Sequence, residues 1–156
     1  MRKLGHPCFF NHIDIAHNYN KQRGVGKALA QFDRSSYFLT TKVMAVDSDT
    51  YKGTTKLLEE DLSLLGLDHV DVMLLHSPAR SCSNIKEQWR AMEDFYAAGK
   101  AKAIGVSNFC KSSFDCFSST WKVKPVINQI EVHVGMGPDP QGLVSYGRNL
   151  GVEAQA

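Results

Sequence analysis

The sequence has 156 residues, of which 43% are hydrophobic and 22% are charged. These fractions are typical of a globular domain and argue against a disordered, collagen-like or coiled-coil chain. The formal net charge is only +2, which gives no support for nucleic acid or an anionic membrane as a partner. No stretch approaches the roughly 18 apolar residues of a membrane span, and no apolar run follows the basic start, so neither a membrane helix nor a signal peptide is expected.

The cysteines include no CxxC pair, and no His/Cys pairs stand at the spacing of a zinc site. We therefore predict small, buried, reduced thiols, no metal site and a cytoplasmic location. The cysteines in question are Cys8, Cys82, Cys110 and Cys116.

Short apolar runs alternate with longer amphipathic ones along the chain. Strands are predicted at residues 9–16, 37–43, 70–75, 103–106, 126–131 and 152–156. Helices are predicted at residues 24–32, 49–65, 85–98, 111–119 and 140–150. The helix at 49–65 has the strongest signal, because Leu58, Leu62 and Leu65 recur at helical spacing and Gly66 follows them.

This alternation, without a β-hairpin signal, indicates βα units and a parallel sheet in one domain that spans residues 1–156. The strand centres lie about 28 residues apart, close to the roughly 30 residues of one βαβ crossover. An open doubly wound sheet and a (β/α)8 barrel both fit. Eight such units would need roughly 220 residues, so a barrel made from this chain alone is incomplete.

Polar side chains stand at the carboxyl ends of five successive predicted strands, where parallel βα folds carry their active sites. They are Asp14 with Tyr19 in the following turn, Lys42, His76, Ser107 with Asn108, and Gln129.

Each of these residues has an ordinary alternative role. Asp14 could cap a helix or face solvent, Lys42 could be solvated, and His76 could be a hydrogen-bonded structural histidine. Ser107 and Asn108 could form a helix N-cap pair, whereas an amide inside an apolar strand needs partners. Their occurrence in strand order favours a shared site over five coincidences.

The set suits the reduction of a carbonyl group. A lysine beside Tyr19 would favour the phenolate and so make the phenol a better acid, and Asp14 would hold Lys42 in place. His76 could donate a hydrogen bond to a carbonyl oxygen. Protonation of that oxygen is half of a reduction, and the other half is a hydride from a nicotinamide.

The same stretches resemble the aldo-keto reductase superfamily, which is made of (β/α)8 barrels that reduce aldehydes and ketones with NADPH. They are Asp14-Ile15-Ala16 with Tyr19, Thr41-Lys42, Leu75-His76-Ser77-Pro78, Gly105-Val106-Ser107-Asn108-Phe109 and Asn128-Gln129-Ile130-Glu131. The resemblance implies that Tyr19 is the proton donor, helped by Lys42 and Asp14, and that His76 aligns a small carbonyl substrate. It also implies that Ser107, Asn108 and Gln129 hold the nicotinamide carboxamide of NADP(H).

The chain departs from the family pattern at both ends and in one turn. Little corresponds to the first strand and its Gly-rich turn, or to the last two strands and their basic, phosphate-binding cluster. Lys21-Gln22-Arg23 also stands where acidic residues are usual after the catalytic tyrosine.

We therefore predict a partial barrel with the family's strands two to six and the start of the seventh. As an isolated chain it should be weakly active or inactive, and able to self-associate through its open sheet edge. The alternative is a non-catalytic or regulatory barrel-derived protein that acts through a protein partner.

Overall fold

The fold is known from a computed structural model, which describes residues 11–156. Cys8, the basic start of the chain and the predicted beginning of the first strand lie outside the described residues. Among the helices of residues 11–156, none has the length and apolar character needed to cross a membrane.

Six parallel strands form one sheet in the order β1-β2-β3-β4-β5-β6, so each strand pairs with its neighbour in the sequence. The strands are β1 (His12–Asp14), β2 (Phe38–Val43), β3 (Val70–Leu75), β4 (Ala101–Ser107), β5 (Ile127–Gln129) and β6 (Glu153–Gln155). The α-helices are α1 (Gln22–Leu29), α2 (Thr50–Leu65), α3 (Cys82–Ala97), α4 (Lys111–Phe117) and α5 (Leu143–Asn149).

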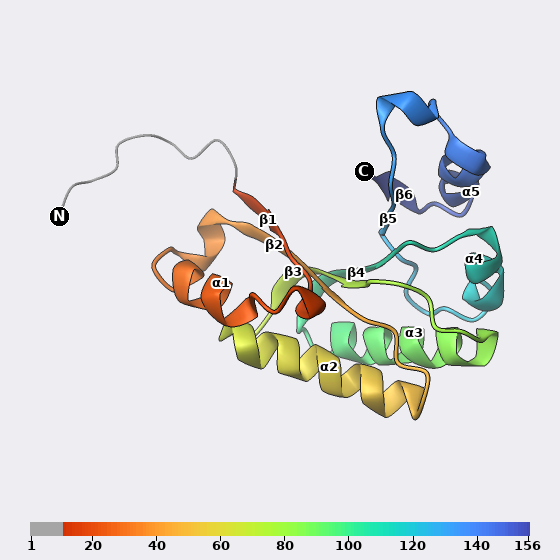
Figure 1. Cartoon of the computed structure of the whole chain (residues 1–156). Helices are drawn as coiled ribbons and strands as arrows, with labels where there is room; N and C mark the ends of the chain where they lie inside the picture. Colours follow the sequence, from red (N-terminus) through yellow and green to blue (C-terminus); the bar gives the residue numbers. More distant parts are fainter. Residues whose placement is uncertain (1–10) are drawn as a thin grey trace.

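The sheet curls, and α2 and α3 lie along its outer face while the inner face stays open (Figure 1). This is the geometry of a (β/α)8 barrel that is only partly built, which confirms the predicted fold class. The predicted strand at the end of the chain is present as β6 and pairs with β5.

One predicted helix is interrupted. Residues 140–150 form a short 3-10 turn, η4 (Pro140–Gly142), followed by α5. Gln141 and Gly142 have φ values of 56° and 65°, in the left-handed region. A continuous helix cannot pass through two such residues, and a pattern of apolar residues does not reveal them.

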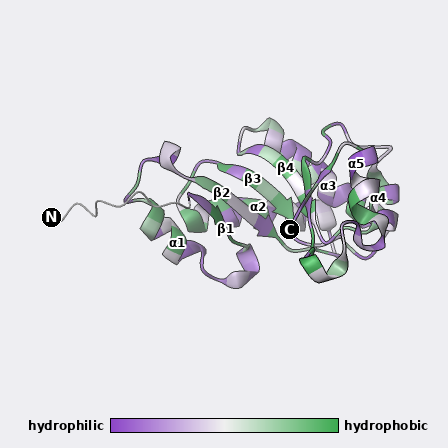
Figure 2. Cartoon of the chain, turned by 90° about the horizontal axis from the view of Figure 1, so that it is seen from above, coloured by the Kyte–Doolittle hydropathy of each residue, from purple (hydrophilic) through white to green (hydrophobic). Residues whose placement is uncertain are grey.

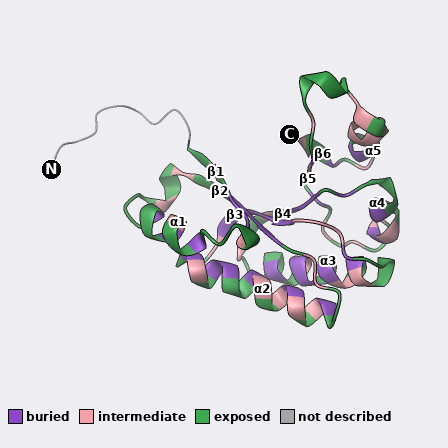
Figure 3. Cartoon of the chain, viewed as in Figure 1, coloured by how far each residue is buried: buried purple, intermediate pink, exposed green. Residues whose placement is uncertain are grey.

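The core lies between the sheet and the helices on its outer face. Every residue of β3, a central strand of the curled sheet, is buried. Figure 3 shows buried residues along β2, β3 and β4 and on the facing sides of α2 and α3. Figure 2 shows hydrophobic residues predominating in the central strands, while the helices carry both kinds. The helix side of this core includes Leu58, Leu62, Leu65, Trp89, Met92 and Phe95.

Asp71 ties three strands together at the end of the sheet opposite the candidate site. Its carboxylate, 4% exposed, accepts hydrogen bonds from the amide of Leu39 (2.8 Å), from Arg34 (2.7 Å) and from Lys102 (2.8 Å). Burial raises the pKa of Asp71, but the hydrogen bonds from Lys102, Leu39 and Arg34 outweigh it and hold the pKa below its usual value. This residue therefore has a structural role.

The prediction of small, buried, reduced thiols is wrong for Cys82 and Cys116, and for Cys110 only its burial is wrong. Cys82, the first residue of α3, forms a disulfide with Cys116 in α4, where the two Cα atoms are 4.9 Å apart. Cys110 is a free thiol, and it is exposed. The two cysteines are 34 residues apart in sequence, and the helices that carry them pack side by side. No spacing motif in the sequence signals such a contact. The predicted reducing compartment rested on these thiols and stays a prediction.

Helix α1 packs on the end of α2 through Gly26. A Cβ atom at this position would overlap the backbone carbonyl of Leu65, whereas a Cβ at Gly24 in the same helix would meet nothing within 4 Å.

We predict opposite effects of alanine at these two glycines. Gly26→Ala should lower the free energy of unfolding by about 1–3 kcal/mol, because the backbone of α2 would have to move. Gly24→Ala is the control and should raise it by about 0.5–1 kcal/mol, because alanine favours a helix. Urea unfolding followed by circular dichroism measures both, and equal effects would contradict the close approach.

Candidate active site

The sequence-predicted site residues lie at the carboxyl edge of the sheet. Asp14, Lys42, Ser107 and Gln129 stand at or one residue before the ends of β1, β2, β4 and β5, and His76 follows β3. Tyr19 ends the 3-10 turn η1 (His17–Tyr19), which connects β1 to α1. Direct side-chain contacts link most of the set.

Lys42 is buried and held by Asp14. It is 2% exposed, and its ammonium donates hydrogen bonds to the Asp14 carboxylate and to the carbonyl oxygen of Ile15 (3.1 Å). The ordinary alternative of a solvated lysine is therefore wrong for Lys42, whereas Asp14 faces both solvent, with its side chain 35% exposed, and this ammonium. An ammonium has three N–H groups, so one remains for a further acceptor.

Tyr19 lies beside both Lys42 and His76. The Lys42 nitrogen is 5.7 Å from the centre of the Tyr19 ring, and the Tyr19 and His76 rings meet edge to face with centres 5.7 Å apart. The backbone amide of Tyr19 donates a hydrogen bond to the carbonyl of Ala16, and Asn20 ends the turn with a left-handed φ of 57°. Tyr19 as a whole is 49% exposed, so this residue is open to solvent.

His76 is fixed by its backbone and by one ring nitrogen. Its amide donates to the carbonyl of Val43 (2.8 Å), its carbonyl accepts from Asn108 (2.9 Å), and Nδ1 lies 3.0 Å from Oδ1 of Asn18. Burial, and then the charge of Lys42, lower the pKa of His76, with Asp14 opposing. The lowered pKa favours the neutral ring, which has one donor and one acceptor nitrogen.

Asn18 was not singled out from the sequence, although it contacts His76 directly. As placed, Oδ1 of Asn18 accepts from the Nδ1–H of His76, which leaves Nε2 as the acceptor nitrogen; rotation of the Asn18 amide would bring Nδ2 to Nδ1 and move the ring proton to Nε2. Asn18 can thus set which nitrogen of His76 donates toward the site. The contact joins residues 58 positions apart, so only the fold reveals it.

Ser107, Asn108 and Gln129 form one hydrogen-bonded group. The Ser107 hydroxyl donates to the carbonyl of Gln129 (2.9 Å), and Nδ2 of Asn108 donates to the Ser107 hydroxyl (3.1 Å). Nε2 of Gln129 donates to Asp14 (2.7 Å) and so connects this group to the ion pair. The N-cap alternative is wrong, because α4 has Cys110 as its N-cap residue.

The donor and acceptor set fits a carboxamide. None of the side-chain hydrogen bonds within residues 11–156 uses Oδ1 of Asn108 or Oε1 of Gln129. Both oxygens can accept from an amide NH₂ group. Asn128, quoted only as part of a motif, has a supporting role: its side chain accepts from the Phe109 amide (3.3 Å) and donates to the Phe109 carbonyl (2.8 Å). This pair fixes the loop that carries Asn108.

Comparison with known proteins identifies the family. The sequence model of the aldo/keto reductase family matches residues 6–155. The chain belongs to this family. It is 33% identical to a glyoxal reductase of Bacillus subtilis over 149 residues, which cover 94% of the chain and 52% of that protein.

Two solved structures show the same fold. An aldo-keto reductase from a Medee basin deep-sea metagenome library is 32% identical, with a TM-score of 0.84 over 95% of this chain and 54% of that one. An aldo-keto reductase of Bombyx mori, solved in complex with NADP, is 33% identical, with a TM-score of 0.77 over 94% and 51%. The chain spans about half the length of the curated relatives that it matches.

We predict an asymmetry between the two partners of the ion pair. Asp14→Ala should lower the free energy of unfolding by about 3 kcal/mol, because it leaves the buried Lys42 ammonium without a counter-charge. Lys42→Met should cost less, because the Asp14 side chain is 35% exposed and keeps its hydrogen bond to Gln129. Urea unfolding at pH 7 compares the two variants. Equal losses would show that Lys42 is not the buried partner.

Proposed function

We propose that this chain carries the catalytic side of an NADP(H)-dependent reductase that converts small aldehydes or ketones into alcohols. The observation that carries the proposal is the buried Lys42 ammonium, which is held by Asp14 and lies beside Tyr19, whose ring in turn meets that of His76. An ammonium is costly to bury in an apolar site, and here it stands next to an exposed tyrosine.

In this proposal Tyr19 donates its proton to the carbonyl oxygen of the substrate. The unused N–H of Lys42 favours the phenolate that is left behind, and Asp14 keeps Lys42 in place. With the Asn18 amide rotated so that Nδ2 donates to Nδ1, the Nε2–H of His76 donates a hydrogen bond to the same oxygen and orients it. Lys42 comes from β2, His76 follows β3 and Tyr19 ends η1, and the Lys42 ammonium and the His76 ring both lie beside the Tyr19 ring.

The cofactor part of the proposal rests on the hydrogen-bonded group formed by Ser107, Asn108 and Gln129. A nicotinamide supplies a hydride when bound, and Ser107, Asn108 and Gln129 would hold its carboxamide. The NADP complex of the Bombyx mori relative supports NADP(H) as the cofactor, and the glyoxal reductase relative supports a small carbonyl substrate. A cytoplasmic location and self-association through the outer strands stay predictions.

Tyr19→Phe tests the acid. We expect turnover to fall about 10²–10⁴-fold, as for loss of a general acid, with the affinity for NADPH unchanged. The assay is NADPH oxidation with a nitrobenzaldehyde, on a chimaera that joins residues 1–155 to the second half of the glyoxal reductase. Tyr37→Phe, away from the site, is the matched control.

Two results would count against the proposal. Turnover retained in Tyr19→Phe would remove Tyr19 as the acid. A folded chimaera that binds NADPH but reduces none of a panel of aldehydes would favour the regulatory alternative.

Residues 1–156 by themselves should bind NADPH no better than about millimolar and show little turnover. Ser107, Asn108 and Gln129 offer neutral hydrogen bonds worth only about 0.5–1.5 kcal/mol each. Ordering a large, flexible cofactor costs several kcal/mol, and charge-assisted phosphate contacts would be needed to offset it. A fluorescence titration that gives micromolar affinity would contradict this prediction.

A further inference from the structure

The disulfide between Cys82 and Cys116 joins the two βα units that carry His76 and Asn108. Cys82 begins α3, shortly after His76 in the chain, and Cys116 lies in α4, which follows the loop of Asn108. A hydrogen bond from Nδ2 of Asn108 to the carbonyl of His76 (2.9 Å) joins the same two units at the edge of the sheet. The units are thus linked twice, once by a covalent bond and once inside the candidate site.

The α3 end of the disulfide is fixed by other contacts as well. Just before the helix, the amide of Arg80 donates to the Asp47 carboxylate (2.8 Å), and the amide of Ala79 donates to the buried side chain of Gln88 (2.8 Å). Ser81 is the N-cap residue of α3, and its hydroxyl accepts a hydrogen bond from a backbone amide of the first turn. The start of α3 therefore keeps its place when the disulfide opens.

Helix α4 is short and depends on its packing. It has seven residues, and a helix of this length is not stable by itself in water. Phe114 and Phe117 bury it in the core, where Phe117 meets Trp89 of α3 with ring centres 5.3 Å apart. The disulfide adds a covalent tie at Cys116. Loss of this tie would loosen α4 together with the preceding loop, which carries Asn108.

The two sulfur atoms differ in accessibility. Cys82 is exposed, whereas Cys116 is partly buried and packs against the core. Cys82 also stands at the amino end of a 16-residue helix, where the helix dipole stabilises a thiolate. A thiol in solution can therefore reach Cys82 in the folded protein, and exposed disulfides are the ones that exchange readily with a thiol pool.

We propose that Cys82 and Cys116 form a redox-sensitive tie, which a low-molecular-weight thiol such as glutathione opens, and that opening it loosens α4 and the contact between Asn108 and His76. The redox chemistry and the movement of α4 do not rest on the proposed function. Only their consequence does: a displaced Asn108 would hold the nicotinamide carboxamide less well.

The exchange has two balanced steps. The thiolate of one glutathione attacks Sγ of Cys82, the bond to Cys116 breaks, and the Cys116 sulfur leaves and takes up a proton. A second glutathione attacks the glutathione sulfur of this mixed disulfide and releases Cys82 as a thiolate. Two glutathione thiols are thereby oxidised to one glutathione disulfide, and the protein disulfide is reduced to two thiols. Oxidised glutathione reverses both steps.

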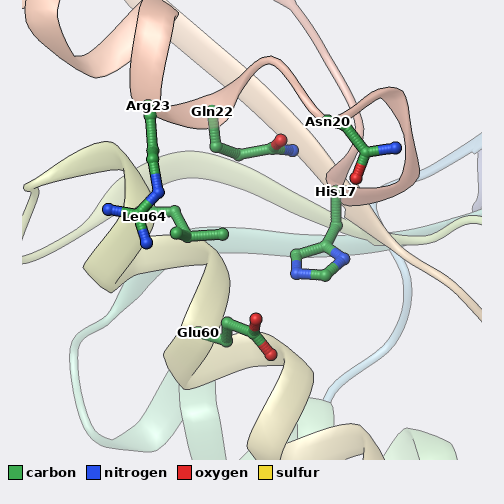
Figure 4. A pocket seen from close by; sticks show the side chains of 6 residues that line it. All are labelled: His17, Asn20, Gln22, Arg23, Glu60 and Leu64. Atoms are coloured by element: carbon green, nitrogen blue, oxygen red, sulfur yellow. The ribbon is translucent and has the colours of Figure 1, made fainter.

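The turn that carries Tyr19 lies away from this tie. Helix α1, which follows the turn, and α4 lie at opposite ends of the row of helices (Figure 1). Beside the turn, the Gln22 amide points into a pocket of about 270 Å³ that His17 and Glu60 also line (Figure 4). Opening the disulfide should therefore affect Asn108 and leave Gln22 unchanged, so the side-chain NH₂ groups of these two residues are a reporter and its control.

The first experiment tests the chemistry on the full chain. Cys8→Ser combined with Cys110→Ser leaves Cys82 and Cys116 as the only cysteines. Reduced glutathione should make both thiols of the folded protein titratable, and oxidised glutathione should restore the disulfide. When the exchange is stopped with acid, mass spectrometry should find glutathione bound to Cys82 and not to Cys116.

The second experiment compares the oxidised and reduced forms by NMR. The amide of Ser118, which is hydrogen-bonded at the end of α4, should exchange about tenfold faster or more after reduction, because a covalent constraint on this segment is removed. The amide of Ile85, which is hydrogen-bonded in the first turn of α3, should keep its rate. The side-chain NH₂ signals of Asn108 should shift, and those of Gln22 should not.

Cys82→Ser in the same background opens the tie by exchanging one atom, and the parent protein is its matched control. The variant should show the exchange rates of the reduced form in both glutathione buffers. The first two experiments need no variant of the tie, so they decide the matter even if this variant does not fold.

Four results would overturn the proposal. They are a disulfide that glutathione opens only after urea has unfolded the chain, glutathione bound to Cys116 alone, exchange at Ser118 that reduction leaves unchanged, and an acceleration shared equally by Leu74 in the central strand β3. None of these measurements uses turnover. Failure of the proposed function would appear only in the Tyr19→Phe assay, so the two failures are distinguishable.

Discussion

An ammonium group withdrawn from water needs a negatively charged partner. At the carboxyl edge of this sheet, the positions of Asp14, Lys42 and Tyr19 depend on that pairing. Lys42 is 2% exposed and bonded to Asp14, which requires β1 to pair with β2 in the register that opposes Asp14 to Thr40. The turn η1 follows directly and delivers Tyr19 to the same ammonium. A shift of β1 by one residue would turn Asp14 to the other face and separate the pair.

Strand β2 carries a carboxylate contact on each of its faces. Lys42 binds Asp14 on the inner side, and the adjacent Thr41 binds Asp61 on the helix side. The two carboxylates differ in environment: the Asp14 side chain is 35% exposed and faces a cation, whereas Asp61 is fully buried and faces a hydroxyl. One strand thus links the proposed catalytic lysine on the inner face to the packing of α2 on the outer face.

The periodicity of the sequence predicted the strands and helices well, because the buried faces of β3 and α2 leave a clear apolar pattern. The strand ends also predicted Asp14, Lys42 and His76 together, since parallel strands bring their carboxyl ends to one edge. Asn18, Asp61 and the disulfide could not be found this way. Each depends on contacts between residues far apart in sequence, and a lone Asp61 in a helix has the same pattern as any surface acid.

Gln129 connects the two halves of the proposed site. Its backbone carbonyl accepts a hydrogen bond from Ser107, and its side-chain Nε2 donates one to Asp14. Gln129 therefore belongs both to the hydrogen-bonded group with Ser107 and Asn108 and to the surroundings of the Lys42–Asp14 ion pair. Under the proposed function Gln129 would receive the carboxamide through Oε1 while Nε2 keeps its bond to the carboxylate that holds Lys42. A change in the position of this side chain would then act on both the cofactor contact and the placement of the ammonium. Under the same proposal the buried charge of Lys42 would set where the proton is delivered, and Gln129 would relate that point to the place where the hydride arrives.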